Sequence, residues 1–232
     1  MVPKLWTGDP TVPGLIYCHG YATTNREPLA NAASDAIAMW KLIARIAEDR
    51  PVLSCDFGLD AWGNASAVSK VTSAVAHLRA TYGVHPSKVF LFGQSMGHLT
   101  AMNWAAQNKA QVAGVIGSMG VADLKHIHDL TNPEGGYLYR ASIDAAYTNG
   151  YTDAQYGAAH NPIVNAGTKY AGMPWLDLYG TGDTVASPAR AEALKTAIGS
   201  TARTIPVAGT HNWPTIDNYP VDEVLGFLND NS

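Results

Sequence analysis

The stretch Val89-Phe-Leu-Phe-Gly-Gln-Ser95-Met-Gly97 joins an apolar run to a segment with the composition of a helix. A short apolar run that ends at a glycine is typical of a buried strand. Glycines stand two positions before and two positions after Ser95, as they do in turns too tight for a neighbouring Cβ atom. The pattern predicts a strand, a tight turn and a helix, with the Ser95 hydroxyl held above the end of a sheet at the helix N-terminus.

The alternation of short apolar runs and helical patterns extends along the rest of the chain. Strands are predicted at Gly14–Cys18, Val52–Cys55, Lys88–Phe92, Val112–Ile116, Pro174–Tyr179 and Thr201–Val207. Helices are predicted at Pro28–Asp49, Asn64–Tyr82 (Asn64 as N-cap, Gly83 as C′ residue), Met96–Asn108, Ser187–Gly199 and Val221–Asn229. Strands that alternate with helices predict an α/β fold, in which a mainly parallel sheet of about six strands is flanked by helices.

One long segment, from residue 121 to 172, interrupts this alternation and is rich in Tyr, Asn, Gly and His. Connections of this length are uncommon in small domains unless they have a function. At 232 residues the chain is best interpreted as one domain, 1–232. We therefore expect the segment 121–172 to be a lid-like insertion within that domain, partly helical, which lies over one edge of the site.

The overall composition excludes several classes of protein. Hydrophobic residues make up 47% of the chain and charged residues 15%, which is enough apolar material for a core and too little charge for a disordered chain. A net charge of −4 with no basic cluster argues against nucleic acid as the main partner. No run of 18 apolar residues and no secretory signal pattern is visible, so we expect no membrane span. The expectation is a soluble protein, either cytoplasmic or secreted with its signal removed, whose oligomeric state the sequence leaves open.

The two cysteines, Cys18 and Cys55, are too few for a disulfide framework or a four-cysteine zinc site. Both lie in predicted strands, and free cysteines are usually buried. We expect two buried thiols, while a single bridge between neighbouring strands stays open as the alternative.

A serine hydroxyl is a weak nucleophile unless a general base takes its proton and an acid orients that base. Among the eight histidines, His211 is placed best, because it follows the last predicted strand and precedes the final helix. Asp183 follows the fifth strand within Gly180-Thr-Gly-Asp183, where the same edge of the sheet is expected. Asp123, just after the fourth strand, is the alternative acid. The order Ser95, Asp183, His211 is the order found in hydrolases with this type of turn.

Two further patterns do not predict a bound metal or cofactor. His126-x-His128 lacks a matched set of carboxylates or cysteines, so a solvated pair is favoured over a zinc site. Gly180-Thr-Gly182 lacks the third glycine and the following helix of a nucleotide-binding turn. We expect no metal and no organic cofactor.

Together, His19-Gly20 after the first strand, the Gly-Gln-Ser95-Met-Gly turn, Gly180-Thr-Gly-Asp183 and the late His211 resemble the α/β-hydrolase superfamily. The resemblance implies an oxyanion hole made by the backbone N–H groups of Tyr21 and Met96. The turn is also similar to that of cutinase-like and polyester-degrading esterases and small lipases. Members of the superfamily usually carry two more strands before the His-Gly strand, whereas only thirteen residues precede it in this chain.

This resemblance implies hydrolysis of carboxylic esters through an acyl-enzyme, with a small-molecule or polymeric ester as substrate. Trp62 and Trp213 are candidate substrate-binding residues, and Tyr21, Tyr137, Tyr139 and Tyr147 are further candidates for an apolar cleft. Two alternatives stay open from sequence. One is an acyltransferase or peptidase with the same three residues, and the other is a catalytically idle hydrolase fold that serves as a binding or structural module.

Overall fold

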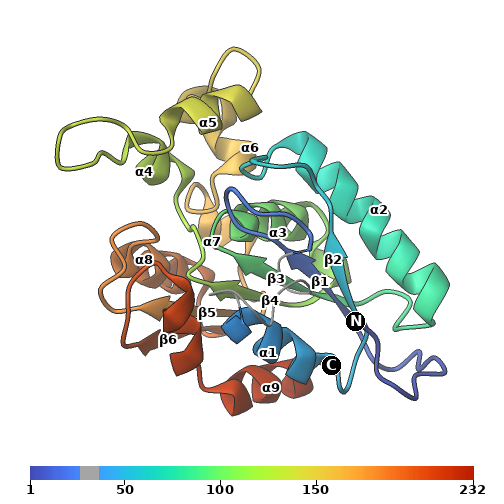
Figure 1. The fold of residues 1–232 in the computed structure, drawn as a ribbon. Helices are drawn as coiled ribbons and strands as arrows, with labels where there is room; N and C mark the ends of the chain where they lie inside the picture. The colour runs from blue at the N-terminus through green and yellow to red at the C-terminus, as the bar shows by residue number, and fades with distance from the viewer. Residues whose placement is uncertain (27–36) are drawn as a thin grey trace.

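Six parallel strands form one sheet in the order β2-β1-β3-β4-β5-β6 (Figure 1). The structure is a computed structural model that describes residues 1–26 and 37–232. The strands are β1 (Gly14–Cys18), β2 (Val52–Cys55), β3 (Val89–Gln94), β4 (Val112–Ser118), β5 (Trp175–Gly180) and β6 (Ala202–Val207). All six predicted strands are confirmed, and β3 and β4 each extend two residues beyond the predicted end.

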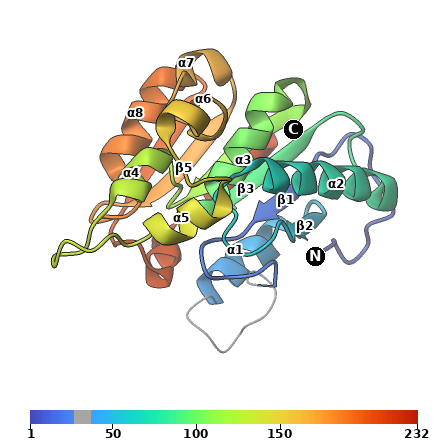
Figure 2. The ribbon, with the colours of Figure 1, turned by 90° about the horizontal axis from the view of Figure 1, so that it is seen from above.

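Helices cover both faces of this sheet (Figures 1 and 2). The five long helices are α1 (Ile37–Ile46), α2 (Ala65–Tyr82), α3 (Met96–Gln107), α8 (Pro188–Ile198) and α9 (Val221–Asp230). Side chains of β1 alternate between the two faces, since successive residues of a strand point in opposite directions. Leu15 and Tyr17 pack in the apolar layer with α1 and α9, whereas Ile16 packs with α2, α3 and α8.

The predicted helix ends are confirmed at α2 and partly corrected elsewhere. Asn64 accepts a hydrogen bond from the Ala67 N–H, and Gly83 ends α2 with a left-handed φ of 58°. Ser187 precedes Pro188, the first residue of α8, but its side chain makes no capping hydrogen bond. The helix predicted at Pro28–Asp49 ends at Ile46 instead, and its first part, including Leu29, Ala33 and Ala36, lies outside the described residues.

The segment 121–172 lies between β4 and β5 and consists of short helices. These are α4 (Leu124–Asp129), α5 (Arg140–Ala146), the π-helical turn η2 (Asp153–Gly157), α6 (Ala158–His160) and α7 (Ala166–Lys169). Hydrogen bonds join it to the loop after β2: Trp62 Nε1 donates to Ser142 Oγ at 2.8 Å, and Asn64 Nδ2 donates to the Ala146 carbonyl at 2.8 Å. The insertion is thus attached to the layer that contains α2 and α3 (Figure 2).

On one side of β3 the sheet has two strands, β1 and β2. Strand β2 is the outermost strand, and Cys18 and Cys55 are register partners on β1 and β2. Both thiols are free and buried, so the favoured interpretation of the cysteines is confirmed. Within the part of the chain that the structure describes, no helix is long and apolar enough to cross a membrane.

Candidate active site

Ser95 lies in a tight turn between β3 and α3, with a left-handed φ of 48°. A Cβ atom at Gly93 would collide with the His98 backbone, and one at Gly97 would collide with the Cys18 carbonyl oxygen. These two collisions explain why glycine is needed on both sides of the serine. The turn is held further by a 2.9 Å hydrogen bond from the Ser95 N–H to the Ser118 carbonyl on β4. The predicted strand, turn and helix are therefore present.

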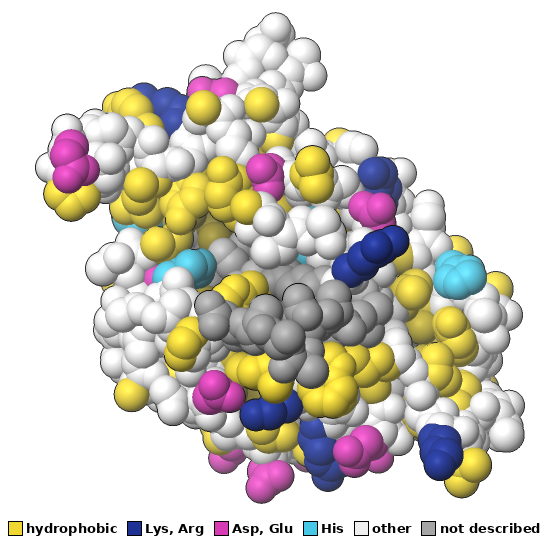
Figure 3. Space-filling view, in the orientation of Figure 1, with side chains coloured by type: hydrophobic (Ala, Val, Ile, Leu, Met, Phe, Trp, Pro, Cys, Tyr) yellow, Lys and Arg dark blue, Asp and Glu magenta, His cyan; other side chains and the backbone are white. Residues whose placement is uncertain are grey.

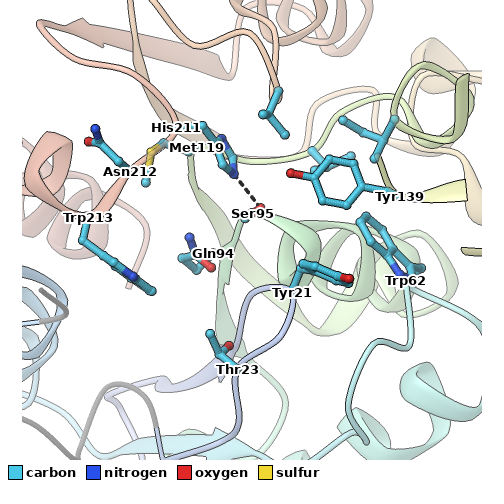
Figure 4. A pocket seen from close by; sticks show the side chains of 13 residues that line it. Tyr21, Thr23, Trp62, Gln94, Ser95, Met119, Tyr139, His211, Asn212 and Trp213 are labelled. Atoms are coloured by element: carbon cyan, nitrogen blue, oxygen red, sulfur yellow. Dashed lines mark hydrogen bonds between the residues drawn. The ribbon is translucent and has the colours of Figure 1, made fainter. Parts of the chain in front are cut away.

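Three side chains that are far apart in sequence meet above the carboxyl ends of the strands, and Figure 4 shows two of them, Ser95 and His211. Ser95 Oγ lies 2.8 Å from His211 Nε2, and His211 Nδ1 lies 2.7 Å from Asp183 Oδ2. The buried Asp183 carboxylate also accepts hydrogen bonds from the Val185 and Ala186 N–H groups, at 2.8 and 2.9 Å. Since the carboxylate accepts from His211 Nδ1–H, the neutral ring leaves Nε2 as the acceptor for the serine proton.

The alternative acid, Asp123, belongs to a different set of contacts. It caps α4 by accepting from the His126 N–H at 3.2 Å, accepts from Asn161 Nδ2 at 3.0 Å, and pairs with Arg190 at 3.4 Å. The structure therefore brings Asp183, and not Asp123, to His211.

The two histidines of the His-x-His pattern lie on α4 without a metal-binding arrangement. His128 lies between the carboxylates of Asp129 and Asp144, at 2.9 and 3.1 Å. Within residues 1–26 and 37–232, no group of three His, Cys, Asp or Glu residues could hold a metal ion.

The two residues whose N–H groups the resemblance assigns to an oxyanion hole lie close to the serine: Met96 follows it directly as the first residue of α3, and Tyr21 lines the same cavity. The Gly20 carbonyl accepts from Thr23 Oγ1 at 2.8 Å and lies 3.0 Å from His19 Nδ1. Because this carbonyl and the Tyr21 N–H belong to one planar peptide unit and point in opposite directions, these contacts fix the direction of the N–H.

Two buried histidines support this part of the molecule. His19, which follows β1, stacks on Phe57 with ring centroids 4.2 Å apart. His98 Nδ1–H donates to the Val121 carbonyl at 3.0 Å, and His98 Nε2 accepts from Trp175 Nε1 at 3.0 Å. Burial lowers the pKa of His98 to about 4, so the ring is neutral and fully hydrogen-bonded at neutral pH.

Asp177, on β5, is a buried carboxyl group close to this site. Its Oδ1 accepts from the Gly120 N–H at 3.2 Å, while Oδ2 has no hydrogen-bond partner among the described residues. Burial raises the pKa of Asp177 well above its usual range. The carboxyl group therefore keeps its proton to a higher pH than a solvent-exposed aspartate does, and its Oδ1 holds the loop after β4 in place.

A cavity of about 290 Å³ opens beside Ser95 and His211. Hydrophobic side chains gather along the edge of the insertion on the face shown in Figure 3. Both predicted substrate residues, Trp62 and Trp213, line the cavity. The other lining side chains come from the end of β3, from loops that follow the strands and from the segment 121–172, and are Gln94, Tyr21, Thr23, Met119, Val185, Asn212, Val121, Ile127 and Tyr139.

Two of the four candidate tyrosines do not line this cavity. Tyr137 is 52% exposed and its ring contacts the Arg140 guanidinium, and Tyr147 is buried and donates from its hydroxyl to the Trp62 carbonyl at 2.8 Å. The sequence reasoning missed Thr23, which holds the Gly20 carbonyl. A hydroxyl residue three positions after that glycine is the signal that could have found it, since Ser and Thr side chains often bond to nearby backbone groups.

Comparisons with known proteins find likeness in structure alone. No protein-family model and no curated protein sequence matches the chain. The esterase RhEst1 from Rhodococcus sp. ECU1013 matches with a TM-score of 0.62 and 16% identity, over 97% of this chain and 94% of that one. FphF, a fluorophosphonate-binding serine hydrolase from Staphylococcus aureus, matches with a TM-score of 0.68 and 14% identity, over 99% and 91%. Est1E from Butyrivibrio proteoclasticus matches with a TM-score of 0.64 and 16% identity, over 98% and 89%. In its parallel sheet, its flanking helices and its likeness to these enzymes, the chain has the α/β-hydrolase fold.

Proposed function

We propose that the protein is a serine hydrolase that cleaves carboxylic esters through an acyl-enzyme. The observation that carries the proposal is the chain of two short hydrogen bonds, 2.8 Å from Ser95 Oγ to His211 Nε2 and 2.7 Å from His211 Nδ1 to Asp183 Oδ2. This arrangement supplies a nucleophile, a general base and a group that orients the base. The esterases and serine hydrolases among the structural neighbours support the same class of reaction.

In the first half-reaction, Ser95 Oγ attacks the ester carbonyl carbon while His211 Nε2 takes the hydroxyl proton. The negative charge that develops on the carbonyl oxygen is stabilised by the N–H groups of Tyr21 and Met96, the second of which also lies at the N-terminus of α3. The C–O bond to the alcohol then breaks, and His211 gives its proton to the leaving oxygen. The acyl group remains on Ser95, and Asp183 stabilises the charged imidazole throughout.

In the second half-reaction, water takes the place of the serine hydroxyl. His211 accepts a proton from this water, the hydroxyl attacks the acyl carbon, and the bond to Ser95 breaks with return of the proton to Oγ. Removal of one oxyanion donor from such a site typically lowers kcat by roughly 10²- to 10³-fold. All the steps use only side chains, backbone amides and water.

The test compares the wild-type protein with Ser95→Ala on a short-chain p-nitrophenyl ester. We expect turnover by the wild type, and loss of that turnover in Ser95→Ala with an unchanged circular dichroism spectrum. Wild-type rates retained by the variant would refute the assignment of the nucleophile.

Parallel reactions separate the two alternatives. Transfer of the acyl group to an added alcohol in preference to water, or cleavage of a peptide in preference to the ester, would identify an acyltransferase or a peptidase. A fluorophosphonate probe that fails to label Ser95 would favour the idle module. We expect labelling at Ser95 and hydrolysis of the ester as the main reaction.

A further inference from the structure

Three aromatic side chains from three separate segments meet on one side of Ser95. Tyr21 follows β1, Trp62 follows β2, and Tyr139 precedes α5 in the insertion. The ring centroids lie 5.4 Å apart for Tyr21 and Trp62, 5.3 Å for Tyr21 and Tyr139, and 5.6 Å for Trp62 and Tyr139. All three line the cavity, and Trp213 lies on the other side of the serine (Figure 4). We call Tyr21, Trp62 and Tyr139 the aromatic corner.

The geometry of the aromatic corner suits a flat ring. The planes of Tyr21 and Tyr139 are inclined by 85°, so their rings stand nearly at a right angle. A planar aromatic ring that stacks on one of them presents its edge to the other, and both arrangements are favourable for aromatic pairs. A saturated ring of the same size gains the apolar burial but not these directional contacts.

Trp62 is held in this corner at a backbone conformation that is unfavourable for a bulky residue, with a φ of 47°. Its Nε1–H is already donated to Ser142, and its carbonyl already accepts from the Tyr147 hydroxyl. The indole is therefore fixed from the insertion and is only 2% exposed, so it supports the two tyrosines from behind. Strain of this kind at a site points to a requirement for that position of the ring.

The rest of the cavity sets the charge and the size of the group that fits. Apart from His211, the lining residues that the structure describes carry no ionisable side chain other than tyrosine, so none of them would pair with a charged substituent on the ring. Aliphatic side chains of Val121, Ile127 and Val185 complete the lining. A cavity of about 150 Å³ is sufficient for benzene in another protein, so about 290 Å³ leaves room for one ring and the ester group.

The mechanism decides which half of the ester faces the corner. His211 gives a proton to the leaving oxygen, so the alcohol lies toward His211 and the residues that follow it, Asn212 and Trp213. The acyl group then lies on the other side of Ser95. Resting on the proposed ester hydrolysis, we infer that the substrates are neutral esters whose acyl group carries a single aromatic ring, which binds in the corner of Tyr21 and Tyr139.

The test uses two pairs of esters that differ only in the ring. Methyl phenylacetate and methyl cyclohexylacetate carry it on the acyl side, and benzyl acetate and cyclohexylmethyl acetate carry it on the alcohol side. A methylene group separates the ring from the ester in all four, and the rate of alkaline hydrolysis of each ester without protein corrects kcat/KM for the remaining difference in intrinsic reactivity within each pair. We expect kcat/KM to favour the phenyl over the cyclohexyl acyl group by roughly two- to tenfold, the range of aromatic pair contacts, and to show no such preference on the alcohol side.

Variants then locate the preference. Tyr139→Leu should abolish it, and Tyr139→Phe should keep it, because the ring is retained. Tyr137→Leu is the matched control: it removes an exposed tyrosine from the same insertion, outside the cavity, and should leave the preference intact.

Four results would overturn the inference. The first two are equal kcat/KM values for the two acyl-side esters, and a preference for the phenyl ring that appears only in the alcohol-side pair. The other two are a preference for the phenyl acyl group that is retained in Tyr139→Leu, and one that is lost in Tyr137→Leu. Such results with all four esters still hydrolysed would leave the proposed ester hydrolysis standing. Absence of turnover with all four esters, together with no fluorophosphonate labelling of Ser95, would refute the proposed function and the inference together.

Discussion

The Asp183 carboxylate is held by two backbone N–H groups and faces His211 with its remaining oxygen. Replacement of Asp183 by Asn keeps the shape of the side chain. Because the two backbone N–H groups hold the remaining oxygen, the NH₂ group of Asn faces His211 Nδ1 and cannot accept a hydrogen bond from it. The imidazole is then no longer fixed in the tautomer that takes the serine proton. We expect kcat for ester hydrolysis to fall by roughly 10⁴-fold in Asp183→Asn. Steady-state kinetics with a chromogenic ester measures the effect.

Asp123→Asn is the matched control for this substitution. Asp123 is also a buried acid in a loop that follows a strand, but its contacts are with α4, Asn161 and Arg190. Its replacement should change kcat by no more than a few-fold. The opposite ranking of the two variants would show that Asp123 is the functional acid.

The residues of the site differ in how far sequence alone could predict them. Ser95, Asp183 and His211 each follow a recognisable strand, and the glycines beside Ser95 and Asp183 mark turns at the same sheet edge. The choice of Tyr139 over Tyr137 could not be made in this way. The two tyrosines are neighbours in an irregular segment, and only the packing of α5 against the loop after β2 turns Tyr139 toward the cavity.

Helix α2 and the insertion are joined through Asn64, which has two roles. Its side-chain oxygen, Oδ1, caps α2 by accepting a hydrogen bond from the Ala67 N–H. Its side-chain nitrogen, Nδ2, donates to the Ala146 carbonyl at the end of α5. Asn64→Ala removes both contacts, whereas Asn64→Ser keeps a hydroxyl that can cap the helix but does not reach Ala146. We expect Asn64→Ala to lower the free energy of unfolding by about 1 kcal/mol more than Asn64→Ser does. Urea unfolding followed by circular dichroism measures the difference, and equal losses in both variants would assign the stability to the contact with Ala146 instead.

The predicted elements are right where the hydrophobic pattern is strong and uncertain where it is weak. Strands β1, β3, β4 and β5 are buried at every residue, and the long helix α2 carries clear end signals, Asn64 and Gly83. The end of α1 at Ile46 was predicted three residues too late, because Ala47 to Asp49 continue a helical composition without a breaking residue. The segment 121–172 could be recognised as a break in the alternation of strands and long helices, but its helices of three to seven residues are too short to give a periodic pattern.

The pH dependence of the stability of the whole protein should reflect two buried groups with opposite effects. The pKa of Asp177 is raised by burial, so the folded protein keeps a proton that the unfolded chain releases above about pH 3.9. Its contribution to stability is therefore fully present at low pH and is lost as the pH rises toward the raised pKa. Asn at this position keeps an acceptor for the Gly120 N–H and does not titrate. We expect Asp177→Asn to raise the free energy of unfolding relative to the wild type, and by more at pH 8 than at pH 5.

His98 acts in the other direction. Burial lowers its pKa to about 4, and the unfolded chain binds a proton at this residue below about pH 6.5. The stability that the neutral, buried ring contributes is lost as the pH falls from about 6.5 to about 4. Once Asp177 no longer opposes this effect, the Asp177→Asn protein should lose stability in that window more steeply than the wild type. Urea midpoints at pH 4.5, 5, 6.5 and 8 test both statements, and a constant difference between the two proteins at all four values would contradict them.

The fold brings Ser95, Asp183 and His211 together from three segments of the chain, and the proposed function depends on a covalent step at the first of them. Rapid mixing with p-nitrophenyl acetate, acid quenching and mass spectrometry of the proteolytic peptides would locate the acyl group. We predict that it is found on Ser95 of the wild-type protein, and that no acylated peptide accumulates in Ser95→Ala. An acyl group found on another residue of the active protein would contradict the proposed mechanism. Full esterase activity of the Ser95→Ala variant would contradict it as well.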